Sequence, residues 1–138
     1  MTQYILDACA MLALLRREPG CEIVVGAFDE VDNGAAIILM HKANLLEVYY
    51  DLYRTYGRAR ARETLDIILG RPIRIISGIS DAVFEEAARL KSLYKVSFAD
   101  TFALATTSVS NGVLLTADHH EMDKIEQSEP EIKFRWIR

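Results

Sequence analysis

The chain has 138 residues, of which 51% are hydrophobic and 26% charged, and its formal net charge is −4. This length fits one domain with one core, and the composition excludes a disordered or fibrous protein. The two cysteines, Cys9 and Cys21, form no CxxC motif and no Cys/His cluster, which argues against a zinc site or a disulfide scaffold.

Short apolar runs bounded by turn residues alternate with amphipathic stretches along the chain, which is typical of an α/β fold with a mostly parallel central sheet. The expected strands are rich in Ile, Val and Leu, which suits strands that are buried on both faces. Five strands are expected, over residues 3–6, 35–39, 73–76, 113–116 and 133–137.

Helices are expected to flank this sheet. The first should end near Pro19-Gly20, because a proline disfavours helix before it, and residues 41–56 show apolar positions at three- and four-residue steps. The expected helices cover residues 10–19, 21–31, 41–56, 59–69, 81–94 and 98–110, with a short one after Asp118. No repeat or linker divides the chain, so we expect residues 1–138 to form a single domain.

The termini and the apolar runs carry no targeting signal. The N-terminus lacks a basic stretch followed by an apolar run and a small-residue cleavage site, and no apolar run approaches the ~20 residues that a membrane span needs. These features predict a cytoplasmic protein with no membrane contact.

Four acidic residues stand in apolar surroundings, namely Asp7, Glu47, Asp100 and Asp118. No Lys or Arg adjoins any of them in the sequence. An unpaired buried carboxylate is costly, so a shared divalent cation is the simplest common solution. Oxygen ligands alone favour Mg²⁺ or Mn²⁺ over zinc.

Each acid also has a plain structural explanation. Asp7, Asp100 and Asp118 stand at expected helix starts, where a carboxylate can accept backbone N–H bonds as a cap. Glu47 lies in mid-helix, where the alternative is an exposed glutamate. A single cluster explains all four at once, and Asp7 and Asp118 follow strands, whose carboxyl ends collect ligands in parallel sheets.

The segments YILDACAML, NLLEV, SFADTFALA and LLTADHHEM resemble the four acidic motifs of PIN-domain ribonucleases, and more narrowly of the VapC toxins of toxin–antitoxin pairs. They come in the family's order, at about its spacing, over essentially the whole chain. The resemblance implies a PIN-like fold and a Mg²⁺-dependent endoribonuclease with the four acids as catalytic metal ligands. It also implies a homodimer and a cognate antitoxin whose tail covers the acidic site.

Three further residues match or depart from the motifs. Thr116 is a hydroxyl residue where the family has one, and it is expected to orient the site. Asn44 lies one helical turn before Glu47, so its amide is expected near that carboxylate. Cys9 stands where the family usually has Ser or Thr, and the weaker donor puts the orientation of the Asp7 loop in doubt.

Charge is distributed unevenly along the chain. Residues 1–53 sum to −5, residues 54–74 to +4 and residues 75–138 to −3. The basic segment could contact RNA phosphates, or it could be a solvated helical face, and the sequence leaves both interpretations open. The candidates for RNA contact are Arg54, Arg58, Arg60 and Arg62.

Two consecutive histidines, His119 and His120, adjoin Asp118 but point in different directions on a helix, so we expect them to be exposed. Glu121 and Asp123 are candidate outer acids of the site. No histidine is placed to activate Cys9 as a nucleophile.

Two other functions are weighed against a nuclease. A phosphoacceptor receiver domain is also small, α/β and acidic at its strand ends, but residues 73–77 lack the acid that it needs after its third strand. A PIN-like domain without catalysis would serve only as an interaction module. No Gly-rich phosphate loop is present to support nucleotide triphosphate hydrolysis.

Overall fold

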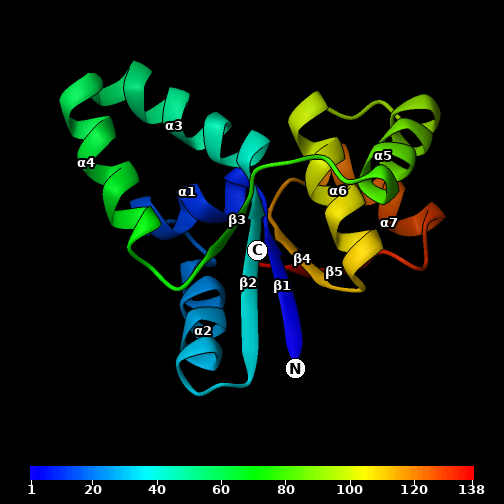
Figure 1. The fold of residues 1–138 in the computed structure, drawn as a ribbon, viewed down its shortest axis with the longest axis horizontal. Coiled ribbons are helices and arrows are strands. Elements are labelled where there is room, and N and C mark those ends of the chain that lie inside the picture. Colours follow the sequence, from blue (N-terminus) through cyan, green and yellow to red (C-terminus); the bar gives the residue numbers. More distant parts are fainter.

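A computed structural model describes residues 1–138 and shows seven helices and five strands (Figure 1). All five strands lie within two residues of their predicted positions, and all seven predicted helices are present. In chain order the elements are β1 (Thr2–Leu6), α1 (Ala8–Arg16), α2 (Cys21–Asp32), β2 (Ala36–His41), α3 (Lys42–Tyr56), α4 (Arg58–Leu69), β3 (Arg74–Ile76), α5 (Asp81–Leu93), α6 (Phe98–Ser110), β4 (Val113–Thr116), α7 (His119–Ser128) and β5 (Lys133–Trp136).

The five strands form one sheet in the order β3-β2-β1-β4-β5, and every pairing is parallel. The chain first builds outward from β1 to β2 and β3, and then crosses to the other side of β1 to add β4 and β5. The carboxyl ends of β1 and β4 are therefore neighbours at the point where the direction reverses. Open α/β sheets bind their ligands at this position.

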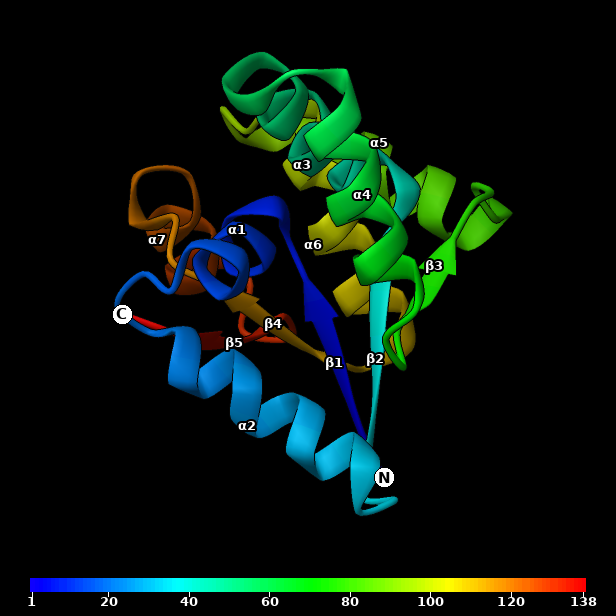
Figure 2. The same ribbon diagram turned by 90° about the vertical axis from the view of Figure 1, so that its left-hand side faces the viewer.

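Alternate residues of the central strands face two separate cores. Tyr4 and Leu6 of β1 belong to a cluster with α1, α2, α3 and α4, whereas Ile5 belongs to a cluster with α5, α6 and α7. Leu115 and Leu114 of β4 divide in the same way, because successive strand residues point to opposite faces. The two helix groups lie on the left and right of Figure 1, and Figure 2 views the α1, α2 and α4 side.

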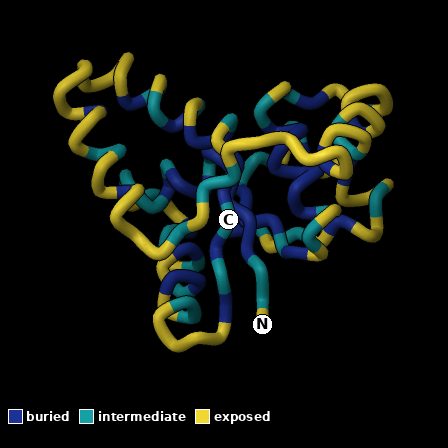
Figure 3. The backbone as a smooth tube through the Cα atoms, in the orientation of Figure 1, coloured by how far each residue is buried: buried dark blue, intermediate teal, exposed yellow.

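Burial follows this three-layer arrangement. Figure 3 shows the buried segments gathered along the central strands and the exposed ones along the outer turns of the helices. Both faces of β1 and β4 are covered, which explains the apolar runs from which these strands were predicted.

Two helices end at residues in the left-handed conformation. Helix α1 ends at Arg16, earlier than predicted, because Arg17 adopts the left-handed conformation with φ of 52°. Helix α6 ends at Ser110, where the next residue, Asn111, is also left-handed, and a Cβ on Gly112 would lie 2.2 Å from the Ile5 side chain. Glycine at that position lets β4 approach β1 closely.

The longest helix, α3, has 15 residues. None of the seven helices combines the length and apolar composition needed to cross a membrane.

Candidate metal centre

The structure brings the four predicted acids to one edge of the sheet. Asp7 follows β1, Asp118 lies two residues after β4, Asp100 is in the first turn of α6, and Glu47 is in α3. A cleft of about 240 Å³ is lined by Glu47, Asp100 and Asp118. Asp7 is 1% exposed, and its carboxylate interacts electrostatically with Asp118 and Glu47.

Asp7 and Asp118 do cap helices, but each uses only one of its two carboxylate oxygens for the cap. Asp7 Oδ1 accepts from the Ala10 amide at 2.8 Å, and Asp118 Oδ1 accepts from the Glu121 amide at 3.2 Å. The second oxygen of Asp7, Oδ2, is buried without a hydrogen-bond partner. A buried carboxylate oxygen without a partner is unfavourable unless it is protonated or meets a water molecule or a cation.

Glu121 takes a larger part in the cluster than its sequence position indicated. Its Oε2 accepts from the Ser97 amide at 2.7 Å, so Glu121, and not Asp100, completes the cap at the start of α6. Oxygens of Asp100, Asp118 and Glu121 lie within 4.8 Å of one another. The three-residue step from Asp118 to Glu121 was the only available signal for this contact, because Ser97 lies far away in the sequence.

No basic side chain neutralises the cluster. None of the seven ion pairs of the chain includes Asp7, Glu47, Asp100 or Asp118. Burial raises the pKa of Asp7 to about 7, although the Thr116 hydroxyl and the Ala10 amide oppose the rise. The acids therefore lack the cation that would hold them ionised in this environment.

The pKa values of Asp100 and Glu47 are raised for the same reasons as that of Asp7. Burial raises the pKa of Asp100 to about 8, with the neighbouring Asp7 carboxylate as the second cause. Burial also raises the pKa of Glu47, followed by the effects of Asp118 and Glu121. Carboxylates that raise one another's pKa are a common feature of functional sites.

The donor set fits a hard divalent cation. The grouped ligand atoms of Asp100, Asp118 and Glu121 are all carboxylate oxygens, which suit Mg²⁺ or Mn²⁺, and no histidine or set of cysteines of the kind that zinc prefers joins them. The unpartnered Asp7 Oδ2 and the absence of basic partners both agree with a bound cation.

Comparisons with known proteins agree with this arrangement. A model of the PIN domain family matches residues 4–127. The chain belongs to the PIN domain family. This membership contradicts the alternative of a phosphoacceptor receiver domain.

Solved structures of toxin–antitoxin proteins share the fold. VapBC2 from Rickettsia felis, bound to a promoter DNA fragment, has a TM-score of 0.77 at 16% identity and covers 98% of both chains. DNA-bound VapBC from Salmonella typhimurium has a TM-score of 0.75 at 11% identity and covers 100% of both chains. VapC20 from Mycobacterium tuberculosis, a sarcin-ricin loop cleaving toxin, has a TM-score of 0.67 at 14% identity over 88% of this chain and 94% of that one. No curated protein matches the chain by sequence.

The three supporting residues of this PIN domain occupy distinct positions. The Thr116 hydroxyl accepts from the Asp118 amide at 3.1 Å, so it orients the loop after β4. Cys9 lines the cleft, and burial raises the pKa of its thiol to about 11, which keeps it protonated and unsuited to nucleophilic attack. The Asp7 cap forms with cysteine at this position, although the family usually has a hydroxyl residue there.

Asn44 acts on a different partner from the one expected. Its amide donates to the Ala99 carbonyl at 3.1 Å instead of reaching Glu47, and the side chain is fully buried. Ala99 directly precedes Asp100, so this bond fixes α3, which carries Glu47, against the start of α6.

We expect Asn44→Ala to lower the free energy of unfolding by about 1–3 kcal/mol, because it removes a buried hydrogen bond between α3 and α6. Urea denaturation measures this change. Asn33→Ala is the control, since Asn33 is exposed, and its effect should stay within about 0.5 kcal/mol. Equal effects of the two substitutions would contradict a positioning role for Asn44.

Of the four predicted RNA-contacting arginines, only Arg54 lines the cleft. It pairs with Asp51 at 3.4 Å. The other three lie on the exposed first turns of α4 and do not line the cleft, although Arg60 stacks over the Tyr56 ring at 4.7 Å. A solvated helical face describes Arg58, Arg60 and Arg62, and their contact with RNA stays a prediction.

Two of the three histidines of the PIN domain, His41 and His119, have structural partners. His119 and His120 are exposed, as predicted, and His119 pairs with Asp123 at 2.7 Å and stacks on Trp136. His41 caps α3 by accepting from the Ala43 amide through Nδ1, while its Nε2 lies 3.0 Å from the Gly78 carbonyl. These partners require a neutral ring with the proton on Nε2, and burial lowers its pKa accordingly.

Proposed function

We propose that this PIN domain is a Mg²⁺- or Mn²⁺-dependent endoribonuclease and the toxin of a toxin–antitoxin pair. One observation carries the proposal: Glu47, Asp100 and Asp118 line one cleft, Asp7 is buried next to them, and none of the four acids has a basic partner. An acidic cluster of this kind is unfavourable without a cation, so its presence indicates a metal-dependent function.

Asp7, Glu47, Asp100 and Asp118 would hold the cation, with Glu121 as an additional oxygen donor. When bound, the cation supplies charge that stabilises a phosphodiester transition state and lowers the pKa of a water molecule. Thr116 and Asn44 keep the carboxylates in position, through the Asp118 amide and the Ala99 carbonyl respectively.

RNA as the substrate follows from the family and from the likeness to VapC toxins. VapC20 of M. tuberculosis is a sarcin-ricin loop cleaving toxin, and several similar structures are toxin–antitoxin complexes. By the same likeness we propose a homodimer and a cognate antitoxin. Of the apolar residues of α1 and α2 that an antitoxin could contact, Val25 is 44% exposed, whereas Leu14 and Leu15 are half-buried against the core and are poorer candidates.

The test incubates the purified chain with RNA and DNA pools in Mg²⁺, Mn²⁺ or EDTA. We expect endonucleolytic cleavage of RNA with either metal, no cleavage with EDTA, and intact DNA. Cleavage in EDTA would contradict the metal-dependent mechanism, and cleavage of DNA alone would contradict the substrate class.

The second candidate function is an interaction module that has lost catalysis, for which the substitution of cysteine at position 9 is the motivating observation. Melting temperatures with and without Mn²⁺ distinguish the two. A module without a metal site would show no rise in melting temperature and no cleavage of either nucleic acid.

A further inference from the structure

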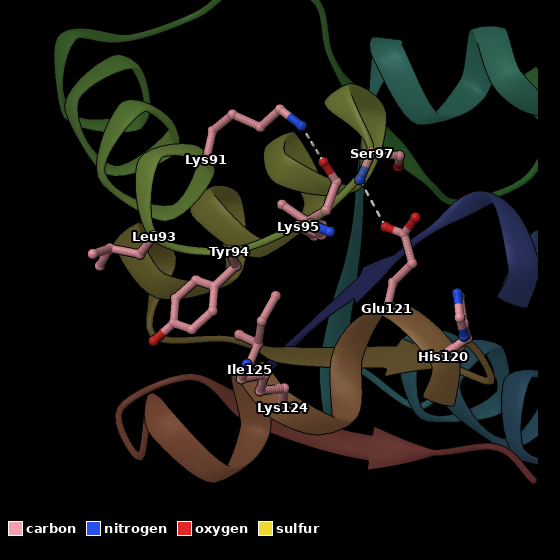
Figure 4. A pocket seen from close by; sticks show the side chains of 10 residues that line it. Lys91, Leu93, Tyr94, Lys95, Ser97, His120, Glu121, Lys124 and Ile125 are labelled. Atoms are coloured by element: carbon pink, nitrogen blue, oxygen red, sulfur yellow. Dashed lines mark hydrogen bonds between the residues drawn. The ribbon is translucent and has the colours of Figure 1, made fainter.

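A second cavity lies beside the acidic cleft. It has a volume of about 750 Å³ and is formed by the end of α5, the connection to α6 and the first turns of α7 (Figure 4). Its polar wall includes Lys91, Lys95, Ser97, His120, Glu121 and Lys124.

The charge of this cavity is opposite to that of the whole chain. Three of the chain's five lysines line it, although the net charge of the chain is −4. No lysine of the chain takes part in an ion pair. Lys91 donates to the Val96 carbonyl, whereas Lys95 and Lys124 have no hydrogen-bond partner in the chain.

The cavity and the acidic cleft share a wall. Figure 4 shows Glu121 pointing to Ser97, whose amide donates to Glu121 Oε2 at 2.7 Å. On the cavity side of this contact lie the lysines, and Glu121 also belongs to the oxygen cluster with Asp100 and Asp118. An anion in the cavity would therefore border the candidate metal centre.

We propose that Lys95 and Lys124 bind a backbone phosphate of the RNA strand next to the one that is cleaved. The inference rests on the proposed function and names a substrate subsite for it. A strand whose phosphodiester lies at the acids must continue over an adjoining surface, and this cavity is the adjoining surface with free cations. Ammonium groups act on phosphate as point charges, so the subsite contributes affinity and register without selecting a base sequence.

The size and shape of the cavity support a polymer in preference to a small anion. At about 750 Å³ it is roughly three times the volume of the 240 Å³ acidic cleft, and Leu93 and Ile125 give it apolar walls beside the charged ones. Such a cavity has room for a nucleotide with its sugar and base as well as its phosphate.

The test measures binding of labelled single-stranded RNA by fluorescence anisotropy, in EDTA and in an Asp100→Asn background. The measurement is repeated at salt concentrations from about 50 to about 200 mM, because contacts with phosphates weaken as salt increases. The double substitution Lys95→Gln, Lys124→Gln should weaken binding. Loss of one phosphate contact lowers the slope of log K against log salt by about 0.7, so the slope should fall by about that amount. Lys91 is left intact because of its bond to the Val96 carbonyl.

Lys133→Gln is the matched control. Lys133 is an exposed lysine that pairs with Val113 at the amino ends of β5 and β4, on the sheet edge away from the acids. It should leave both affinity and slope unchanged.

Because binding is measured without metal and without cleavage, the result does not depend on whether the chain hydrolyses RNA. An unchanged slope in the double variant, an equal loss in Lys133→Gln, or no RNA binding at all would overturn the subsite. The subsite would also be overturned if the double substitution weakened binding of polyglutamate but not binding of RNA. That result would assign the cavity to an acidic peptide.

Discussion

Asp100→Asn is expected to lower the rate of RNA cleavage by about 10³-fold or more and to abolish the rise in melting temperature caused by Mn²⁺. A catalytic cation contributes several kcal/mol of transition-state stabilisation, and ~4 kcal/mol corresponds to about 10³-fold in rate. Asparagine has nearly the same shape as aspartate but carries no charge, so the substitution removes a metal ligand while the start of α6 keeps its packing. The comparison of initial rates in Mg²⁺ and of melting temperatures with and without Mn²⁺ gives both readouts.

Asp7→Asn should behave in the same way. Its side-chain oxygen can still accept from the Ala10 amide, so the cap of α1 is retained while the charge is lost. Asp29→Asn is the control, because Asp29 is an exposed residue of α2 that takes part in no ion pair. Cleavage that survives Asp100→Asn would disprove the nuclease assignment.

The metal-free protein is expected to lose stability as the pH rises from 5 to 8. The pKa of Asp7 is raised from 3.8 to about 7 and that of Asp100 to about 8, so at intermediate pH the folded chain binds protons that the unfolded chain does not. The stabilisation is fully present below 3.8 and is lost as the pH passes through the raised values. Over that window each protonated carboxyl changes the free energy of unfolding by about 1.4 kcal/mol per pH unit.

Urea denaturation in EDTA at several pH values measures this profile. Asp7→Asn and Asp100→Asn should each flatten it and should stabilise the metal-free protein at pH 8. His41 acts in the opposite sense below its ordinary pKa of 6.5, because burial favours its neutral form, so the comparison with the variants isolates the acids. A profile that rises between pH 7 and 8 and is the same in both variants would contradict the mutual effect of the carboxylates.

The sheet and the positions of the acids could be predicted because their signals are local. Apolar runs such as Val113–Thr116 identify strands directly, and a parallel sheet places the residues after its strands on one edge. Asp7 and Asp118 are found in this way from the sequence alone. Glu47 and Asp100 need the further knowledge that α3 and α6 pack together, which the motif order supplied.

The remaining contacts depend on packing that no local pattern encodes. The bond from Asn44 to Ala99 joins residues 55 positions apart, and the bond from Ser97 to Glu121 joins residues 24 positions apart. The sequence places its basic character in the arginine-rich segment 54–74, but of those arginines only Arg54 lines the cleft. The lysines that line the neighbouring cavity are dispersed along the sequence, and only the fold brings the end of α5, the connection to α6 and α7 around that cavity.

The alternation of β1 and β4 between two cores ties the position of the acids to the folding of the sheet. Leu6 pairs with Leu115, and both belong to the same core, while their neighbours Ile5 and Leu114 belong to the other. A slip of one residue between these strands would turn each apolar side chain toward the wrong layer. A register that misplaces the two acids therefore also destabilises both cores. Any chain that reaches the native state carries Asp7 and Asp118 at the correct separation.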